Sequence, residues 1–238
     1  MPFRILRVAS LALFVTLVQC KHVASTVEKC EPSADPGPGP VPLCWEQLHD
    51  VVNRGSYVLI SADRNSRCDP TEMTDGELLD RTCELAANLR SMGFTYAVAR
   101  GHYGDDEGET SFLVLAEKSE HLKLICLGKN NNQDSIIIGD AGKHTLLFTT
   151  GTYKGKAYTI DAQVSGRKEN PNQHTDIRDK MGARFTFSLG FDKNFDFGNY
   201  EPLFKDSPPS VYEDATKAFA TCPEVPKALD SSPSCAAR

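Results

Sequence analysis

The stretch Ser56-Tyr-Val-Leu-Ile-Ser-Ala62 carries the clearest signal for the fold, because its centre is a continuous run of apolar, strand-favouring residues. A strand with one exposed face alternates apolar and polar residues, whereas a strand that is buried on both faces does not alternate. The stretch therefore predicts a strand in the middle of a sheet.

A helix is predicted directly downstream. Thr74-Asp-Gly-Glu77 has the spacing of a capping box, in which Thr74 and Glu77 satisfy each other's backbone amides. Apolar residues then recur at helical spacing, and Gly93 supplies a stop signal at the C-terminal end. The pattern predicts a helix from Thr74 to Met92 that buries Leu85.

Further strands and a second helix follow. The strands are predicted at Thr95–Arg100, Ser111–Leu115, Ser135–Ile138 and His144–Thr150, and the helix at Ser119–Leu127. The order strand, helix, strand, strand, helix, strand, strand predicts an α+β fold: a ferredoxin-like split βαβ sandwich with an added hairpin.

Weaker patterns flank this unit. They predict a short helix over Trp45–Asn53, one more strand over Ala157–Val164, a loop over the polar segment Ser165–Asp179, an edge strand over Phe185–Leu189 and a short helix near Tyr212–Ala220.

The N-terminus has the organisation of a secretory signal. Arg4 and Arg7 precede an apolar stretch from Ala9 to Val18, which is too short to cross a bilayer core of about 30 Å. Residues 1–20 are therefore predicted to be a signal peptide, with an alternative cleavage site up to residue 25. No later apolar run reaches spanning length, so we expect a secreted, extracellular protein without a transmembrane segment.

Cys20 leaves a second mode of export open. Leu17-Val-Gln-Cys20 loosely resembles a bacterial lipoprotein box, which would make the protein a lipid-anchored periplasmic or cell-surface lipoprotein. Gln19 argues against this alternative, because the residue before the acylated cysteine is normally small.

The mature chain is expected to form one main domain. Residues 21–42 read as a Pro/Gly-rich linker, residues 43–205 as the α+β domain, and residues 206–238 as a Pro/Ser-rich tail with the short helix. The formal net charge of −6 for the full chain argues against a nucleic-acid partner, because no basic face is available for phosphates.

The cysteines predict a disulfide framework, as is usual in exported proteins. Cys126 lies in an apolar stretch and is predicted to be the unpaired thiol of an odd set. The expected disulfide-bonded cysteines are Cys30, Cys44, Cys68, Cys83, Cys222 and Cys235. Their connectivity stays open between local pairs (30–44, 68–83, 222–235) and a Cys44–Cys222 bridge. No Cys/His spacing of a zinc site occurs, so neither a metal site nor a cofactor is expected.

A succession of short motifs resembles a family of small uncharacterised domains of bacteria and phages. The motifs are Ile60-Ser-Ala-x-Arg64, Leu89-Arg-x-x-Gly-Phe94, Gly101-x-Tyr103, Glu109-x-Ser-Phe-Leu-Val114 and Gln133-Asp-Ser-Ile136. The resemblance covers roughly Tyr57 to Gly151. It implies an α+β fold and no particular activity.

Four polar residues are candidates for a ligand site. Arg64, Glu109, Ser111 and Gln133 would lie near the ends of neighbouring strands, where they could bind an anionic or sugar-like ligand. The simpler interpretation is that Arg64 pairs with Glu109 and that the other two residues cap turns.

Other chemical groups are more scattered. The acidic loop Asp105-Asp-Glu-x-Glu109 offers oxygen ligands but lacks the spacing of a calcium loop. His102, His144 and His174, with Ser111 as nucleophile and Asp176 as orienting acid, would suit a hydrolase, although no nucleophile elbow is present.

The sequence therefore favours an exported, non-enzymatic binding or effector-like protein that acts on another protein or a host component. The alternative is a secreted hydrolase or transferase with its site around Arg64, Glu109 and Gln133.

Overall fold

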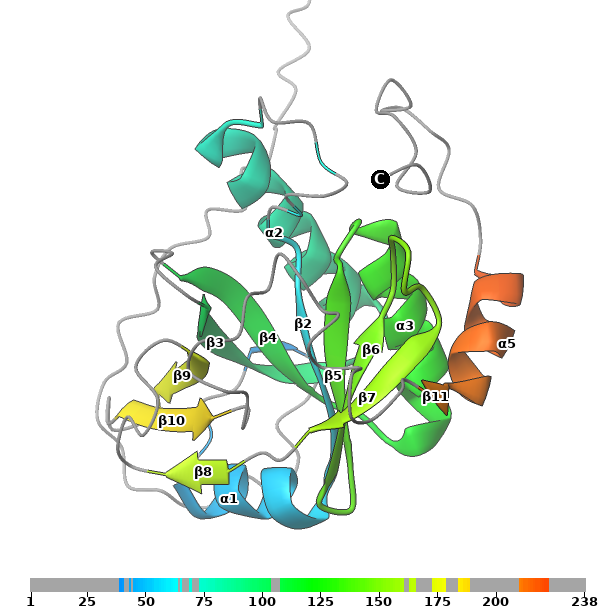
Figure 1. Cartoon of the computed structure of the whole chain (residues 1–238). Helices are drawn as coiled ribbons and strands as arrows, with labels where there is room; N and C mark the ends of the chain where they lie inside the picture. Colours follow the sequence, from blue (N-terminus) through cyan, green and yellow to red (C-terminus); the bar gives the residue numbers. More distant parts are fainter. Residues whose placement is uncertain are drawn as a thin grey trace, which may run out of the picture.

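The computed structural model of the chain describes residues 39–40, 43, 45–63, 65, 69, 73–103, 108–160, 163–165, 173–178, 184–188 and 210–222. These residues form a mixed α+β fold, in which a curled sheet carries one hydrophobic core on each face (Figure 1). In this part of the chain, no helix combines the length and the apolar character needed to cross a membrane.

The helices are α1 (Trp45–Arg54), α2 (Asp75–Ser91), α3 (His121–Asn130), which follows a short 3-10 turn at Lys118–Glu120, and α5 (Glu213–Thr221). The strands are β1 (Gly39–Pro40), β2 (Ser56–Ser61), β3 (Thr95–Tyr103), β4 (Glu109–Leu115), β5 (Ser135–Asp140), β6 (Lys143–Phe148), β7 (Lys156–Ile160), β8 (Gln163–Ser165), β9 (Gln173–Arg178), β10 (Arg184–Ser188) and β11 (Ser210–Val211).

Strand β2 lies in the middle of the sheet, as its sequence predicts. The strand order is β11-β7-β6-β5-β2-β4-β3-β9-β10-β8, and β1 pairs with the outer edge of β3 at its start. The four strands β5, β2, β4 and β3 are antiparallel, with α2 connecting β2 to β3 and α3 following β4.

The sheet is curled back on itself. Strand β7 lies near one end of the strand order and β8 lies at the other end, yet only two residues separate them in the sequence. Three residue steps span at most about 11 Å of extended chain, so the two ends of the sheet must approach each other. Helix α1 contacts β8 on the concave side (Figure 1).

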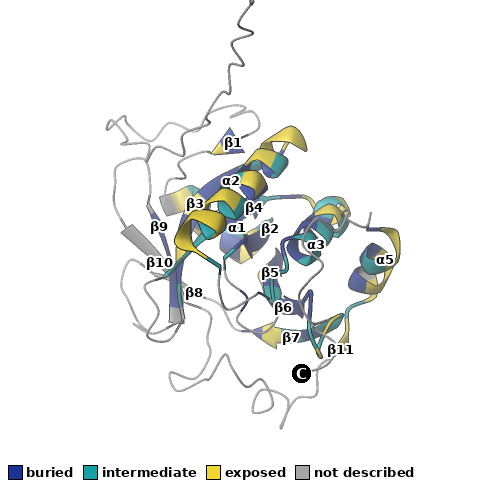
Figure 2. Ribbon diagram, turned by 90° about the horizontal axis from the view of Figure 1, so that it is seen from above, coloured by how far each residue is buried: buried dark blue, intermediate teal, exposed yellow. Residues whose placement is uncertain are grey.

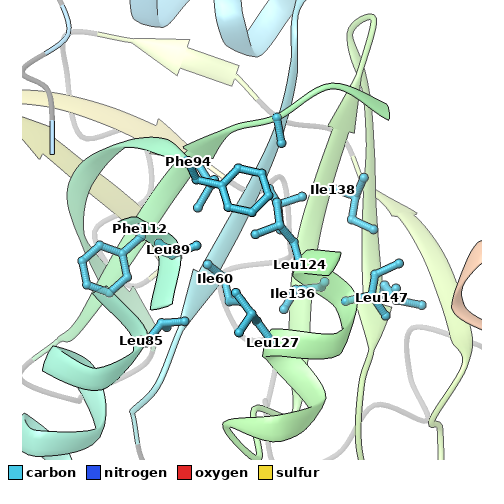
Figure 3. Close-up of a cluster of buried hydrophobic side chains, with 14 of the residues drawn as sticks. Ile60, Leu85, Leu89, Phe94, Phe112, Leu124, Leu127, Ile136, Ile138 and Leu147 are labelled. Atoms are coloured by element: carbon cyan, nitrogen blue, oxygen red, sulfur yellow. The ribbon is translucent and has the colours of Figure 1, made fainter. Parts of the chain in front are cut away.

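Alternate residues of β2 enter two different cores. Val58 and Ile60 point into a first core beneath α2, α3 and α5, whereas Tyr57 and Leu59 point into a second core with α1. Figure 3 shows leucines of α2 and α3 meeting Ile60 and Ile136 in the first core. The helices turn their exposed sides outward and their buried sides toward the sheet (Figure 2).

Helix α2 begins and ends as its sequence predicts. The Glu77 amide donates to the Thr74 hydroxyl over 3.3 Å, and the Thr74 amide donates to the Glu77 carboxylate over 2.7 Å. The bond from the Thr74 amide and, after it, the bond that the Thr74 hydroxyl donates to the same carboxylate over 2.9 Å hold the pKa of Glu77 below its usual value. At the other end, Gly93 has a φ of +85° and Phe94 donates to the Leu89 carbonyl, which together form a Schellman cap.

The disulfides differ from the sequence-based expectation. Cys126 of α3 is not a free thiol but is bonded to Cys222, which follows α5, with their Cα atoms 5.4 Å apart. The expected Cys222–Cys235 and Cys44–Cys222 pairs are therefore wrong. The reason is tertiary, because α5 packs against α3 through small residues such as Ala218 and brings together cysteines that are 96 positions apart.

Of the remaining cysteines, the structure describes only Cys83. Cys83 is disulfide-bonded as predicted, and its partner is not among the described residues. Cys30, Cys44, Cys68 and Cys235 all lie outside the described ranges.

The part of the chain after β7 was the least well predicted. The expected single strand Ala157–Val164 is two strands, β7 and β8, on different ends of the sheet. The expected loop Ser165–Asp179 contains β9, which pairs with β3, and the expected edge strand at Phe185 is β10, which lies between β9 and β8. Strand β9 was missed because polar residues occupy most of its positions, and only its pairing with β3 makes it a strand.

Substitutions in α2 should separate the cap from the core. Thr74→Ala removes the cap and should lower the free energy of unfolding by about 1 kcal/mol. Leu85→Ala leaves a cavity under a fully buried side chain and should cost about 2–5 kcal/mol. Leu79 is more than half exposed, so Leu79→Ala is the matched control and should change stability by at most about 0.5 kcal/mol. Equally small losses for both leucines in urea denaturation would contradict the packing of α2 on the sheet.

Removal of the Cys126–Cys222 bridge should destabilise the protein. The double variant Cys126→Ala/Cys222→Ala frees a loop of 96 residues in the unfolded chain, so the free energy of unfolding should fall by about 2–5 kcal/mol. Non-reducing urea denaturation measures this loss. Peptide mapping of the unreduced wild-type protein is the direct check, and a different partner for Cys222 would refute the bridge.

Candidate functional site

The structure describes three of the four predicted ligand-site residues, because Arg64 lies outside the described ranges. Glu109 and Ser111 are two positions apart on β4 and therefore project from the same face of the sheet. The Ser111 hydroxyl is buried and donates to the Glu109 carboxylate over a long distance of 3.4 Å. Glu109 and Ser111 thus lie on one face of the same strand and interact with each other.

Gln133 is brought to the same end of the sheet and extends its backbone pairing. The register of β2 with β5 ends at the Leu59–Ile137 pair, and beyond it the Ser61 amide donates to the Gln133 side-chain carbonyl over 3.0 Å. Ser61 also lies opposite Ser111 on its other side. Gln133 therefore replaces the carbonyl that β5 would otherwise supply, which is a structural role.

A buried polar cluster follows the end of β2. The Arg81 guanidinium binds both carboxylate oxygens of Asp69 at 3.0 and 2.9 Å and donates to the backbone carbonyls of Ala62 and Asp63. The side chains of Arg81 and Asp69 are only 16% and 3% exposed. Each buried charge therefore requires the opposite charge of the other to offset the cost of its desolvation.

The same cluster reaches the turn after α3. The Asn132 side chain and the Asn65 amide both donate to Asp69 at 2.6 Å, and the Asn65 side chain donates to the Asn132 carbonyl over 2.7 Å and to the Thr150 hydroxyl. These bonds fix the chain after β2 between α2 and the start of β5. The sequence does not predict this cluster, because an arginine within a helix is normally exposed to solvent.

Two of the three candidate histidines lie together on the face of the sheet opposite to Glu109 and Ser111. His102 of β3 and His174 of β9 are direct partners across the ladder, and their rings stack with centroids 4.6 Å apart. Asp176 is two positions beyond His174 on the same face, and its Oδ2 atom lies 3.4 Å from Nε2 of His102 and 3.6 Å from Nε2 of His174.

The sheet separates Ser111 from these histidines. Ser111 pairs with Ala99, whose side chain enters the second core, and His102 is an odd number of positions further along β3. Because neighbouring side chains of a strand point to opposite faces, Ser111 faces away from His102 and His174. The predicted combination of Ser111 as nucleophile with these histidines does not assemble.

His144 lies elsewhere, in the second core. Tyr57 of β2, Gly139 of β5 and His144 of β6 are register neighbours, and the Tyr57 hydroxyl is hydrogen-bonded to His144 Nδ1 at 2.9 Å. A Cβ at position 139 would lie 2.0 Å from the Tyr57 ring, so glycine is required there. Burial raises the pKa of Tyr57, which keeps its hydroxyl protonated. The pair is a satisfied structural contact.

The molecule therefore presents two polar groupings at one end of the sheet, one on each face. The Glu109, Ser111 and Gln133 group is engaged in internal hydrogen bonds, whereas the histidine–aspartate group gathers three possible metal ligands. Comparison of the sequence with protein-family models and with curated proteins finds no match. The function must therefore be argued from these groups alone.

Proposed function

We propose that this chain is an exported, non-enzymatic binding protein that acts through its surface on another protein or a host component. Its scaffold in this proposal is a ferredoxin-like split βαβ unit, formed by β2-α2-β3-β4-α3-β5 and extended by the other strands. The antiparallel order β5-β2-β4-β3, with α2 and α3 packed on the first core, supports this assignment.

The observation that carries the proposal is the use of the predicted ligand-site residues in internal hydrogen bonds. Gln133 completes the pairing of β2, and Ser111 is buried against Glu109. An enzyme needs such groups to be available to a substrate, whereas here Gln133 holds the end of β2 and Ser111 is buried against Glu109. A scaffold whose candidate site residues serve its interior would act through the groups on its surface.

Export is supported by the cysteines and by the N-terminal pattern. The Cys126–Cys222 bridge and the oxidised Cys83 are typical of proteins from oxidising compartments.

The net charge of −6 favours a neutral or basic partner over nucleic acid.

The alternative is a secreted hydrolase or transferase. The feature that favours it is the meeting of Glu109, Ser111 and the end of β2 at one position of the sheet. A general acid or base at Glu109 would need a substrate on the second-core face of that end.

Gln133 should contribute to stability whether or not the protein has a ligand. Gln133→Ala leaves the Ser61 amide without its acceptor and should lower the free energy of unfolding by about 1–3 kcal/mol. Gln133→Glu keeps an acceptor oxygen and serves as the matched control, with a smaller loss. An unchanged urea midpoint for Gln133→Ala would contradict the structural role on which the proposal rests.

The two functions can be distinguished with the full chain expressed in a secretory host. The binding function predicts processed protein in the medium, with no turnover of chromogenic esters, phosphates or glycosides beyond that of a blank. Mass spectrometry of the mature N-terminus checks the cleavage and any lipid at Cys20. Turnover that disappears in Glu109→Gln, at unchanged stability, would overturn the proposal in favour of the enzyme. Retention of the unprocessed chain inside the cells would overturn export.

A further inference from the structure

We propose that His102, His174 and Asp176 form a binding site for one divalent first-row transition metal ion, with Zn²⁺ as the preferred ion. The site goes beyond the proposed binding function and does not depend on it, because it uses residues on the other face of the sheet. It also departs from the sequence-based expectation that the chain has no metal site.

The backbone alone brings the three residues together. His102 and His174 are directly opposite each other in the antiparallel β3–β9 ladder, which places their Cβ atoms within about 5.5 Å. Asp176 follows His174 by two positions and therefore projects from the same face. The three ligands thus come from two hydrogen-bonded strands and not from a loop.

The two distances from the carboxylate to the imidazole nitrogens match those of a coordination sphere. Two atoms that are bound to one ion at about 2.0–2.2 Å, at angles of 90–109°, lie about 2.8–3.6 Å apart. Asp176 Oδ2 lies 3.4 Å from one imidazole nitrogen and 3.6 Å from the other. One ligand atom from each of the three residues lies within 4.8 Å of the other two, and the stacked imidazole rings must turn so that both nitrogen lone pairs point at one ion.

The cluster is held in a protected position. The side chains of His174 and Asp176 are 1% and 6% exposed, whereas that of His102 is 19% exposed and gives access from solvent. Gly108 has a φ of +92°, and a Cβ there would lie 2.9 Å from the His102 ring. The backbone at Gly108 therefore packs directly on this imidazole and restricts its orientation.

The donor set defines the class of ion. Two neutral imidazoles and one carboxylate suit zinc and other first-row divalent ions, whereas Ca²⁺ and Mg²⁺ prefer oxygen ligands only. Three protein ligands leave at least one coordination position for water or for a group of a partner molecule. Within the described part of the chain, every cysteine is oxidised in a disulfide, so none of these thiols competes for the ion.

The competing interpretation is a metal-free ion pair. In that case a protonated histidine pairs with the Asp176 carboxylate, and the stacked rings only fill space. The two interpretations differ in whether the oxidised, folded protein takes up an ion in a fixed ratio.

The test is a titration of the full mature chain, freed of metal by dialysis against EDTA and then against chelator-free buffer. Zn²⁺ is added in competition with a chromophoric chelator, and we expect one ion per chain. Asp176→Asn and His102→Gln should bind the ion at least about 100-fold more weakly, because loss of a ligand exceeds the loss caused by outer contacts. His49→Gln, at an exposed histidine of α1, is the control and should bind as the wild type.

A second readout does not depend on the folding of the variants. Wild-type protein loaded with Co²⁺ should show visible d–d absorption of a nitrogen- and oxygen-ligated ion, and saturating Zn²⁺ should raise its melting temperature. Failure of the wild type to take up Zn²⁺ in a fixed ratio would overturn the site. Equal affinity of Asp176→Asn and the wild type would do the same.

Discussion

Strand β2 is buried on both faces, and the other elements are arranged around it. Its backbone pairs with β4 on one side and β5 on the other, and its side chains alternate between two cores. Each core then requires its own cover: α2, α3 and α5 on one face, and α1 with the curled part of the sheet on the other. Removing either cover would expose apolar residues from the centre of β2 to water, so both cores have to be closed.

At the end of β2, backbone amides and carbonyls no longer have partners on a neighbouring strand, so other groups must form hydrogen bonds with them. The Gln133 side chain accepts a hydrogen bond from the Ser61 amide. Arg81 donates to the carbonyls of Ala62 and Asp63 and pairs with Asp69. Removing these polar groups from water costs free energy. What their hydrogen bonds contribute is one fixed path for the chain. They also show that Gln133, one of the residues predicted to bind a ligand, contributes to the pairing of β2.

The proposed metal site depends on the same sheet but at a later point of the chain. Strand β9 is short of apolar residues, and its His174 and Asp176 would be costly to bury without partners. Pairing with β3 places His102 beside them, and a bound cation would neutralise the carboxylate and use both imidazoles. The cross-strand site and the disulfide between α3 and α5 thus connect the terminal third of the chain to the central sheet.

The local elements could be predicted from the sequence, because their signals lie within a few residues. The unbroken apolar run at Tyr57–Ile60 predicted the central strand, and the spacing of Thr74, Glu77 and Gly93 predicted both ends of α2. Only the tertiary structure decided which distant residues meet. Cys126 looks like a buried thiol until α5 brings Cys222 beside it, and β9 looks like a loop until β3 pairs with it. The sequence likewise named Glu109, Ser111 and Gln133, but their hydrogen bonds, and the separation of Ser111 from His102 by the sheet, depend on register. Register is set by the packing of both cores at once, and no local pattern records it.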